Sequence, residues 1–343
     1  MRRLLNTLYV TTPEAYLACE GENVLVKVDD QIKLRIPIHN LEGIITFGYS
    51  GASPALIKLC CERGVAFSFL SSNGYFLGRV TGKTHGNVLL RRSQYRWSDN
   101  EEITLRLSKR FVVAKILNSR VCLQRALRDH RDKIETYELE LTVDNLKRLA
   151  KEVENVTDID VLRGIEGEAA KQYFKCFDMM ILNQKDEFSF HERIRRPPTD
   201  KVNALLSFLY TILSHDVEAA LESVGLDPQV GFLHSDRPGR SSLALDLMEE
   251  FRAYFVDRMV LSLINRKQIN GKGFIEKESG AVIMNDDTKK TVLTEWQNRK
   301  RDNITHPYLD EKIPVGLLPY AQALLLARHI RGDLDDYPPF FWK

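Results

Sequence analysis

A change in hydrophobic periodicity near residue 87 constrains the fold of this chain more than any other feature. Residues 4–80 contain short runs of branched and aromatic residues, separated by turn signals such as Glu20–Asn23. This pattern is typical of β-strands, with one helix expected from the N-cap candidate Ser53 to Arg63. Beyond residue 87, apolar residues recur at steps of three and four over long segments, which is typical of helices.

The two patterns predict an α+β multidomain protein, and 343 residues exceed the usual size of one domain. We expect a small β-rich, β-sandwich-like domain at residues 1–86, followed by a larger all-α domain at residues 87–343. Helices are expected in the second domain at residues 101–130, 159–182, 200–213, 215–224, 245–265, 288–300 and 316–331. The proline- and aromatic-rich tail, residues 331–343, is expected to be flexible or to dock on a partner.

Composition narrows the class of protein. Hydrophobic residues make up 43% and charged residues 28%, which is ordinary for a globular chain. The longest apolar stretches, such as Ala204–Leu213, are shorter than a membrane span, and no signal-peptide pattern is visible, so we expect a cytoplasmic protein. The five cysteines are odd in number and lack paired spacing, which argues against a disulfide framework or a zinc knuckle.

Charge alone does not predict a nucleic-acid partner, because the formal net charge is only +2. Local basic clusters are nevertheless present, including Arg299–Arg301 and the pair Arg237 and Arg240 in a turn-forming loop after His234. Such clusters suit phosphate contacts, and they equally suit a solvated surface.

Glu166 is the most informative acidic position in the chain. On a helical wheel it falls inside an apolar stripe formed by Leu162, Ala169, Ala170, Tyr173 and Phe177. A carboxylate in that place must be partnered or protonated, because burying an unpaired charge is very costly. A structural salt bridge to an arginine and a metal-binding or catalytic role fit the spacing equally well.

A second group of candidate ligands follows an apolar run that ends at His234. The next predicted helix has a core face of Met248, Phe251, Phe255 and Met259. Asp246, Glu249 and Glu250 lie on the opposite face, where the plain interpretation is a solvated acidic surface. A histidine nitrogen combined with carboxylate oxygens would instead suit Mn²⁺ or Mg²⁺.

These segments also resemble the motifs of a known family. Leu162–Gly167, with the small and aromatic residues that follow it, resembles the signature of the CRISPR-associated integrases, the catalytic subunits of the complex that adds spacers to CRISPR arrays. Gly231–His234 and Leu243–Arg252 resemble the second and third motifs, and Asn203–Tyr210 resembles the helix between the first two. The match spans most of the chain, which is similar to members found in subtype I-C systems.

The resemblance implies a metal-dependent DNA endonuclease and integrase that acts in antiviral defence by phosphodiester transesterification. It implies Glu166, His234 and Glu249 as catalytic ligands of Mn²⁺ or Mg²⁺, with the adjacent Glu250 as an alternative to Glu249. Asp246 matches a further acidic position near the metal. Further candidates for supporting or DNA-contacting roles are Glu250, Arg237, Arg240 and Asn203.

The implied partners are double-stranded DNA, a second copy of the chain that pairs through the β-rich domain, and a dimer of a small ferredoxin-like CRISPR-associated protein. Two alternatives remain from the residues themselves. One is a non-catalytic nucleic-acid-binding scaffold, which would ignore Mn²⁺. The other is a metal-dependent hydrolase of a small phosphorylated substrate, for which the sequence shows no glycine-rich phosphate loop.

Overall fold

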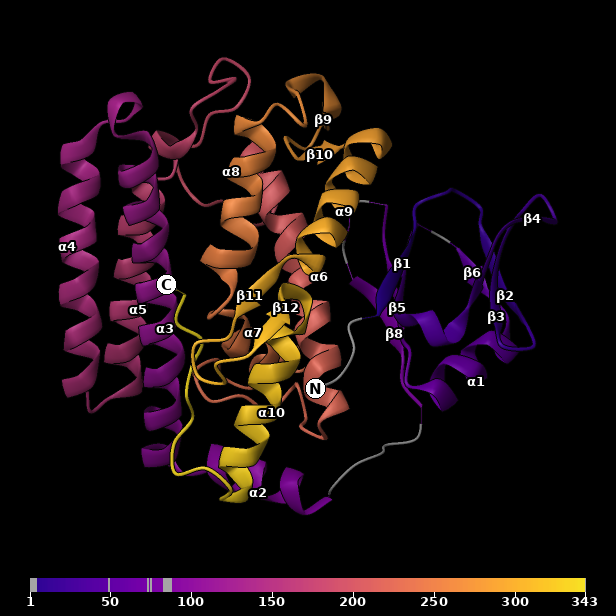
Figure 1. The fold of residues 1–343 in the computed structure, drawn as a ribbon, viewed down its shortest axis with the longest axis horizontal. Helices are drawn as coiled ribbons and strands as arrows, with labels where there is room; N and C mark the ends of the chain where they lie inside the picture. The colour runs from indigo at the N-terminus through magenta and orange to yellow at the C-terminus, as the bar shows by residue number, and fades with distance from the viewer. Residues whose placement is uncertain (1–4, 49, 73, 75, 83–87, 343) are drawn as a thin grey trace. The chain divides into compact units, whose positions relative to one another are not determined.

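A computed structural model describes residues 5–48, 50–72, 74, 76–82 and 88–342. The chain divides into two compact units, and Figure 1 shows the course of the chain through both. The first consists of residues 1–86, 285–302 and 314–317, and the second of residues 87–284, 303–313 and 318–343. The predicted boundary between residues 86 and 87, and the predicted strand starts at residues 4 and 75, lie outside the described residues.

The first unit contains two mixed four-stranded sheets. One has the order β1 (Asn6–Val10), β5 (Leu41–Phe47), β7 (Ala66–Leu70) and β8 (Phe76–Val80), with only β8 antiparallel to its neighbour. The other has the order β4 (Gln31–Pro37), β3 (Asn23–Val28), β2 (Tyr16–Glu20) and β6 (Gly51–Ala52), with β6 parallel to β2 and the other pairs antiparallel. The predicted helix is α1 (Pro54–Arg63), which begins where the Ser53 hydroxyl accepts the Leu56 N–H.

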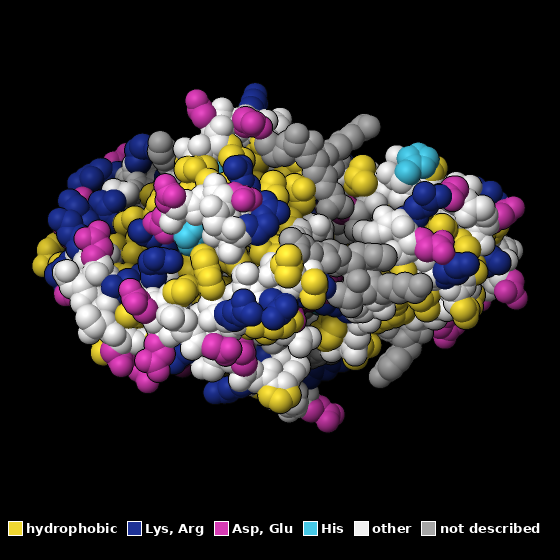
Figure 2. Space-filling view, turned by 90° about the horizontal axis from the view of Figure 1, so that it is seen from below, with side chains coloured by type: hydrophobic (Ala, Val, Ile, Leu, Met, Phe, Trp, Pro, Cys, Tyr) yellow, Lys and Arg dark blue, Asp and Glu magenta, His cyan; other side chains and the backbone are white. Residues whose placement is uncertain are grey.

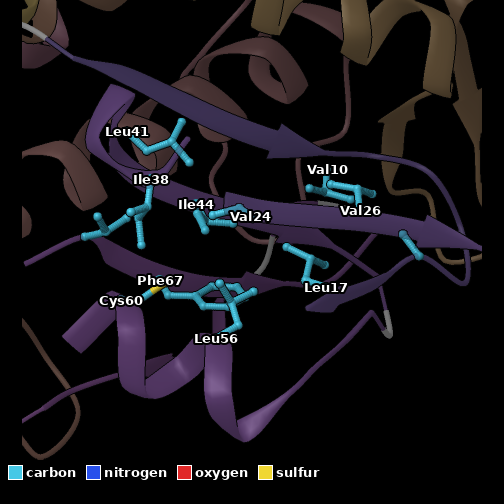
Figure 3. Close-up of a cluster of buried hydrophobic side chains, with 12 residues drawn as sticks. Val10, Leu17, Val24, Val26, Ile38, Leu41, Ile44, Leu56, Cys60 and Phe67 are labelled. Atoms are coloured by element: carbon cyan, nitrogen blue, oxygen red, sulfur yellow. The ribbon is translucent and has the colours of Figure 1, made fainter. Parts of the chain in front are cut away.

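The core of this unit draws on both sheets and on α1 (Figure 3). β2 buries Leu17 between more exposed neighbours, as a period of two predicts, whereas the central strand β5 is buried along almost its whole length. The buried side chains include Val10, Leu17, Val24, Val26, Ile38, Leu41, Ile44, Leu56, Cys60 and Phe67. The prediction of a β-rich N-terminal region is therefore confirmed.

One helix far along the chain belongs to the first unit. α9 (Asp286–Arg301) buries Trp296, donates from Gln297 to the Thr7 carbonyl at 3.1 Å, and pairs Lys300 with Glu42 at 2.8 Å. The sequence pattern had assigned this helix to the helical domain. The hydrophobic periodicity of α9 predicts that one face is buried, but it does not indicate which unit packs against that face.

The second unit is mainly helical. Its helices are α2 (Val88–Ser98), α3 (Glu101–His130), α4 (Thr136–Glu152), α5 (Ile159–Lys175), α6 (Lys201–Ser223), α7 (Ser242–Met248), α8 (Arg258–Asn265) and α10 (Leu318–Arg331). A π-helical turn, Arg252–Asp257, joins α7 to α8. Two short two-stranded sheets, β9 (Phe274–Glu276) with β10 (Val282–Met284) and β11 (Asn303–Thr305) with β12 (Lys312–Pro314), make the all-α prediction too strict.

Other predicted helix boundaries also differ from the structure. α2 and α4 were not predicted, and the two helices expected over residues 200–224 are the single helix α6. By length and composition α6 is apolar enough to cross a membrane, but 61% of its most apolar window is buried in the protein. That burial is typical of a core helix.

The C-terminal tail packs against its own chain, so the expectation of a flexible or partner-bound tail is wrong. Tyr337, Phe340 and Trp342 are buried. The guanidinium groups of Arg125 and Arg258 lie 4.3 and 4.5 Å from the centroid of the Trp342 ring. These aromatic residues bury too much apolar surface to remain in water.

Removing the Phe340 side chain tests the docking of the tail. We expect Phe340→Ala to lower the free energy of unfolding by about 3–5 kcal/mol, because a fully buried aromatic ring leaves a cavity. Urea denaturation measures the change. Tyr137→Ala, at a position that is 74% exposed, is the control and should change stability little; equal effects of the two substitutions would contradict the docked tail.

Candidate metal centre

Glu166 lies on α5 and pairs with a lysine from α3. Its side chain is 25% exposed, and its Oε1 accepts from the Lys115 ammonium group. Lys115 also pairs with Glu249 Oε2 at 2.8 Å, so one ammonium group joins the two carboxylates. The partner expected for Glu166 was an arginine; the structure supplies a lysine that lies 51 residues away.

Glu249 is buried among positive charges. Besides Lys115, its Oε2 lies 2.9 Å from Arg252 Nε. Burial alone would raise the pKa of Glu249, but Arg252, Lys115 and the His234 imidazole outweigh burial and hold that pKa at about 2. Glu249 is therefore ionised, and its Oε2 accepts no well-aligned hydrogen bond although two cations lie close to it.

Asp246 organises the loop that carries His234. Its fully buried carboxylate accepts the backbone N–H groups of Phe232, Leu233 and His234 at 2.6, 3.0 and 2.9 Å. His234 Nδ1 lies 2.7 Å from Asp246 Oδ1 and must donate, because an ionised carboxylate only accepts. In the neutral ring this contact selects the tautomer in which Nε2 carries the lone pair, as a metal-ligating imidazole requires.

Two further residues fix the same loop. A Cβ atom on Gly231 would lie 2.8 Å from Asp246 Oδ2 and from Ser242, so the loop needs glycine to approach α7 this closely. Arg163 on α5 donates two hydrogen bonds to the Leu233 carbonyl, at 2.8 and 3.0 Å. Arg163 thereby connects the helix of Glu166 to the loop of His234.

Glu250 makes a separate set of contacts. Its carboxyl group accepts from the Tyr337 hydroxyl at 2.6 Å, and from Gln322 Nε2 and the Phe340 N–H at 2.8 Å each. Burial raises the pKa of Glu250 to about 8 in spite of these three donors. All three of these donors belong to α10 or the C-terminal tail, so the Glu250 side chain acts as an anchor for the tail.

The acids on and after α7 therefore do not form a solvated face, contrary to the plain interpretation of the sequence. Asp246, Glu249 and Glu250 are all buried, and each has a different set of partners. The continuous helix expected over residues 245–265 is interrupted by the π-helical turn after α7, which changes the direction of the following side chains.

That π-helical turn also supplies a support for Glu249. The Arg252 guanidinium group lies 4.7 Å from the centroid of the Tyr210 ring, and the Tyr210 hydroxyl donates to Asp257. Tyr173 on α5 donates to the other oxygen of Asp257 at 3.0 Å. The sequence analysis missed these supports, although Tyr173 and Tyr210 both lie in the family-like motifs.

The remaining candidates differ in exposure. Asn203 is fully buried, and its Oδ1 accepts from Arg193 at 2.7 Å and from the Ile194 N–H at 3.0 Å, so it holds a neighbouring segment to α6. Arg237 is exposed and Arg240 is half-buried in the loop after His234. These two arginines are accessible to a phosphate group, and Asn203 is not.

The donor set suits a hard divalent cation. In the described parts of the chain, no three His, Cys, Asp or Glu side chains lie close enough to form a ready metal cluster. The Lys115 ammonium group lies instead between Glu166 and Glu249, where it balances the charge of the two carboxylates. Two carboxylates and one imidazole are donors that Mn²⁺ and Mg²⁺ accept.

A β-rich unit combined with a mainly helical unit of this design is the fold of a class of CRISPR-associated endonucleases. Residues 8–298 match the family model described as CRISPR associated protein Cas1. The chain belongs to the Cas1 family.

Individual relatives agree with this family. The chain is 53% identical over 343 residues to CRISPR-associated endonuclease Cas1 1 of Chlorobaculum tepidum, and 49% identical over 347 residues to CRISPR-associated endonuclease Cas1 2 of Rhodospirillum rubrum, with 100% of each chain covered. Among solved structures, a Cas6-RT-Cas1–Cas2 complex matches with a TM-score of 0.83 and 25% identity. That match covers 99% of this chain and 36% of the other.

Removing the Asp246 charge tests how His234 is oriented. We expect Asp246→Asn to weaken Mn²⁺ binding by roughly 10–100-fold, because an amide no longer selects the Nδ1–H tautomer. Isothermal titration calorimetry measures the affinity, and circular dichroism verifies that the loop change leaves the fold intact. A folded variant with wild-type affinity would contradict the orienting role.

Proposed function

We propose that this Cas1 family endonuclease inserts foreign DNA into CRISPR arrays with a divalent cation held by Glu166, His234 and Glu249. The observation that carries the proposal is the shared ammonium group: Glu166 and Glu249, from distant segments, converge on the same nitrogen atom. The His234 side chain lies near enough to Glu249 to interact with it electrostatically. Mn²⁺ and Mg²⁺ both suit this set of donors.

Each residue has a distinct part in the proposed reaction. When bound, the cation polarises the scissile phosphate and stabilises the departing oxyanion. His234 presents Nε2 while Asp246 holds Nδ1, so His234 cannot also serve as a general base. Arg252 keeps Glu249 ionised and fixed, with Tyr210 behind it. The nucleophile, a DNA 3′-hydroxyl or water, gives its proton to solvent or to another acceptor.

Glu249 suits the third ligand position better than Glu250. Glu249 is ionised and shares Lys115 with Glu166. Glu250 makes three hydrogen bonds to α10 and the tail, and its pKa of about 8 leaves it mostly protonated at neutral pH. A protonated, fully engaged carboxyl group is a poor ligand for a hard cation.

The proposed partners follow from family membership. One similar chain was solved in a complex that includes Cas2. We propose a dimer of a small ferredoxin-like partner here, together with a homodimer formed through the β-rich domain, double-stranded DNA as substrate, and a cytoplasmic location. Similarity to subtype I-C members belongs to the same proposal.

Phosphate binding would depend on local arginines, because the surface charge is of mixed sign on the face that Figure 2 shows. Lys and Arg side chains there are interspersed with Asp and Glu side chains. Arg237 and Arg240 follow His234 directly in the chain, and Arg237 is exposed. We propose that these two arginines hold a DNA phosphate beside the cation.

Paired substitutions of the adjacent acids test the ligand assignment. Glu249→Gln should abolish strand transfer and cleavage and remove Mn²⁺ binding, as Glu166→Ala and His234→Ala should, while DNA binding persists. Glu250→Gln is the matched control and should retain Mn²⁺ binding, because the replaced carboxyl group is already neutral. The readouts are a strand-transfer assay with Mn²⁺ and calorimetric titration; loss of Mn²⁺ binding in Glu250→Gln but not in Glu249→Gln would reverse the assignment.

Substitution of the loop arginines tests the phosphate contact. Arg237→Ala and Arg240→Ala should each weaken DNA binding and reduce the slope of log K against log salt by about 1. Fluorescence anisotropy at several salt concentrations measures the slope. Arg148→Ala, an exposed arginine on α4 that pairs with Glu152, is the control; an unchanged slope in both loop variants would remove the proposed contact.

A further inference from the structure

We propose that Lys115 is a built-in counter-cation that occupies the carboxylate pair until a divalent cation displaces it. This inference rests on the proposed function, because it takes Glu166 and Glu249 as metal ligands. Lys115 lies on α3, outside every motif that the sequence analysis identified. Neither the sequence patterns nor the family resemblance assigns it a role.

The position of the ammonium group carries the first step. Lys115 Nζ contacts Glu166 Oε1 and lies 2.8 Å from Glu249 Oε2. A cation shared by two carboxylates would bind in the same gap, since Mn²⁺ and Mg²⁺ bind oxygen at roughly 2.0–2.2 Å. The ammonium group and the divalent cation therefore compete for one place. Only one of them can contact the two carboxylate oxygens at a time.

Two cationic side chains, Lys115 and Arg252, lie next to Glu249, and their other contacts determine which of them moves. Arg252 is held by the Tyr210 ring at 4.7 Å as well as by Glu249. The Lys115 ammonium group pairs with the two carboxylates and stands on a flexible four-carbon stem. Once a divalent cation neutralises those carboxylates, Lys115 loses both of its ion pairs, whereas Arg252 keeps its contact with the Tyr210 ring.

The surroundings also indicate where the displaced group goes. Lys115 itself lines a small cavity, together with the charged residues Arg193, Arg195, Arg252 and Asp257. Three guanidinium groups against one carboxyl group make this cavity unfavourable for the ammonium group once it loses its two carboxylate partners. The Lys115 and Glu166 side chains are 11% and 25% exposed, so the path toward solvent is the favourable one. Displacement should therefore make the Lys115 amine more accessible.

Removing the competing charge tests the exchange. Lys115→Met keeps the length of the side chain without its charge and should bind Mn²⁺ at least about tenfold more tightly than wild type, because no ammonium group must be expelled. Lys109→Met, on the exposed side of α3 where Lys109 contacts the Glu154 carbonyl, is the matched control and should bind as wild type does. Calorimetric titration of Mn²⁺ into the full chain gives the affinities. Equal or weaker binding by folded Lys115→Met overturns the proposal.

A measurement on the wild-type protein keeps the test valid if Lys115→Met does not fold. Amine acetylation followed by mass spectrometry should modify Lys115 slowly without Mn²⁺ and several-fold faster with saturating Mn²⁺, while the rate at Lys109 stays constant. An unchanged or lower rate at Lys115 overturns the exchange. Glu166→Gln and Glu249→Gln separate the two proposals: if they still bind Mn²⁺, the metal site itself is wrong, and if they do not, a failed Lys115 result counts against the exchange alone.

Discussion

Buried carboxylates must be neutralised, and that requirement organises the helical unit of this protein. Asp246, Glu249 and Glu250 lie within five residues of one another and are all buried. Asp246 is stabilised by backbone N–H groups and His234, Glu249 by Lys115 and Arg252, and Glu250 by burial in the neutral form with donors from α10 and the tail. One short segment thus orients a histidine, holds an ionised carboxylate for a cation and anchors the C-terminus.

The sequence predicted the parts of the site that depend on local periodicity. Glu166 stood out because it interrupted an apolar stripe, and the structure shows it partly buried and paired. The change of period near residue 87 predicted the β-rich and mainly helical regions, and the structure confirms that fold class. The resemblance to a known family predicted the family and the enzyme class, and the comparisons with relatives show both.

Features that depend on tertiary contacts were not predictable in the same way. Lys115 looks like any lysine on a long helix, and only the fold brings it to Glu166. The acids on and just after α7 were expected to be solvated because an amphipathic helix usually exposes one face, whereas this segment packs against α3, α6 and α10 and is buried on both faces. The apolar residues of α9 and of the aromatic tail were visible in the sequence and predict burial. They do not indicate which part of the protein packs against them.

The location of a bound cation tests the proposed centre most directly. Anomalous diffraction from crystals soaked in Mn²⁺ should show one peak within about 2.3 Å of oxygen atoms of Glu166 and Glu249 and of His234 Nε2, with the Lys115 ammonium group moved away. Mn²⁺ bound at other residues, with Lys115 still between the two glutamates, would contradict it.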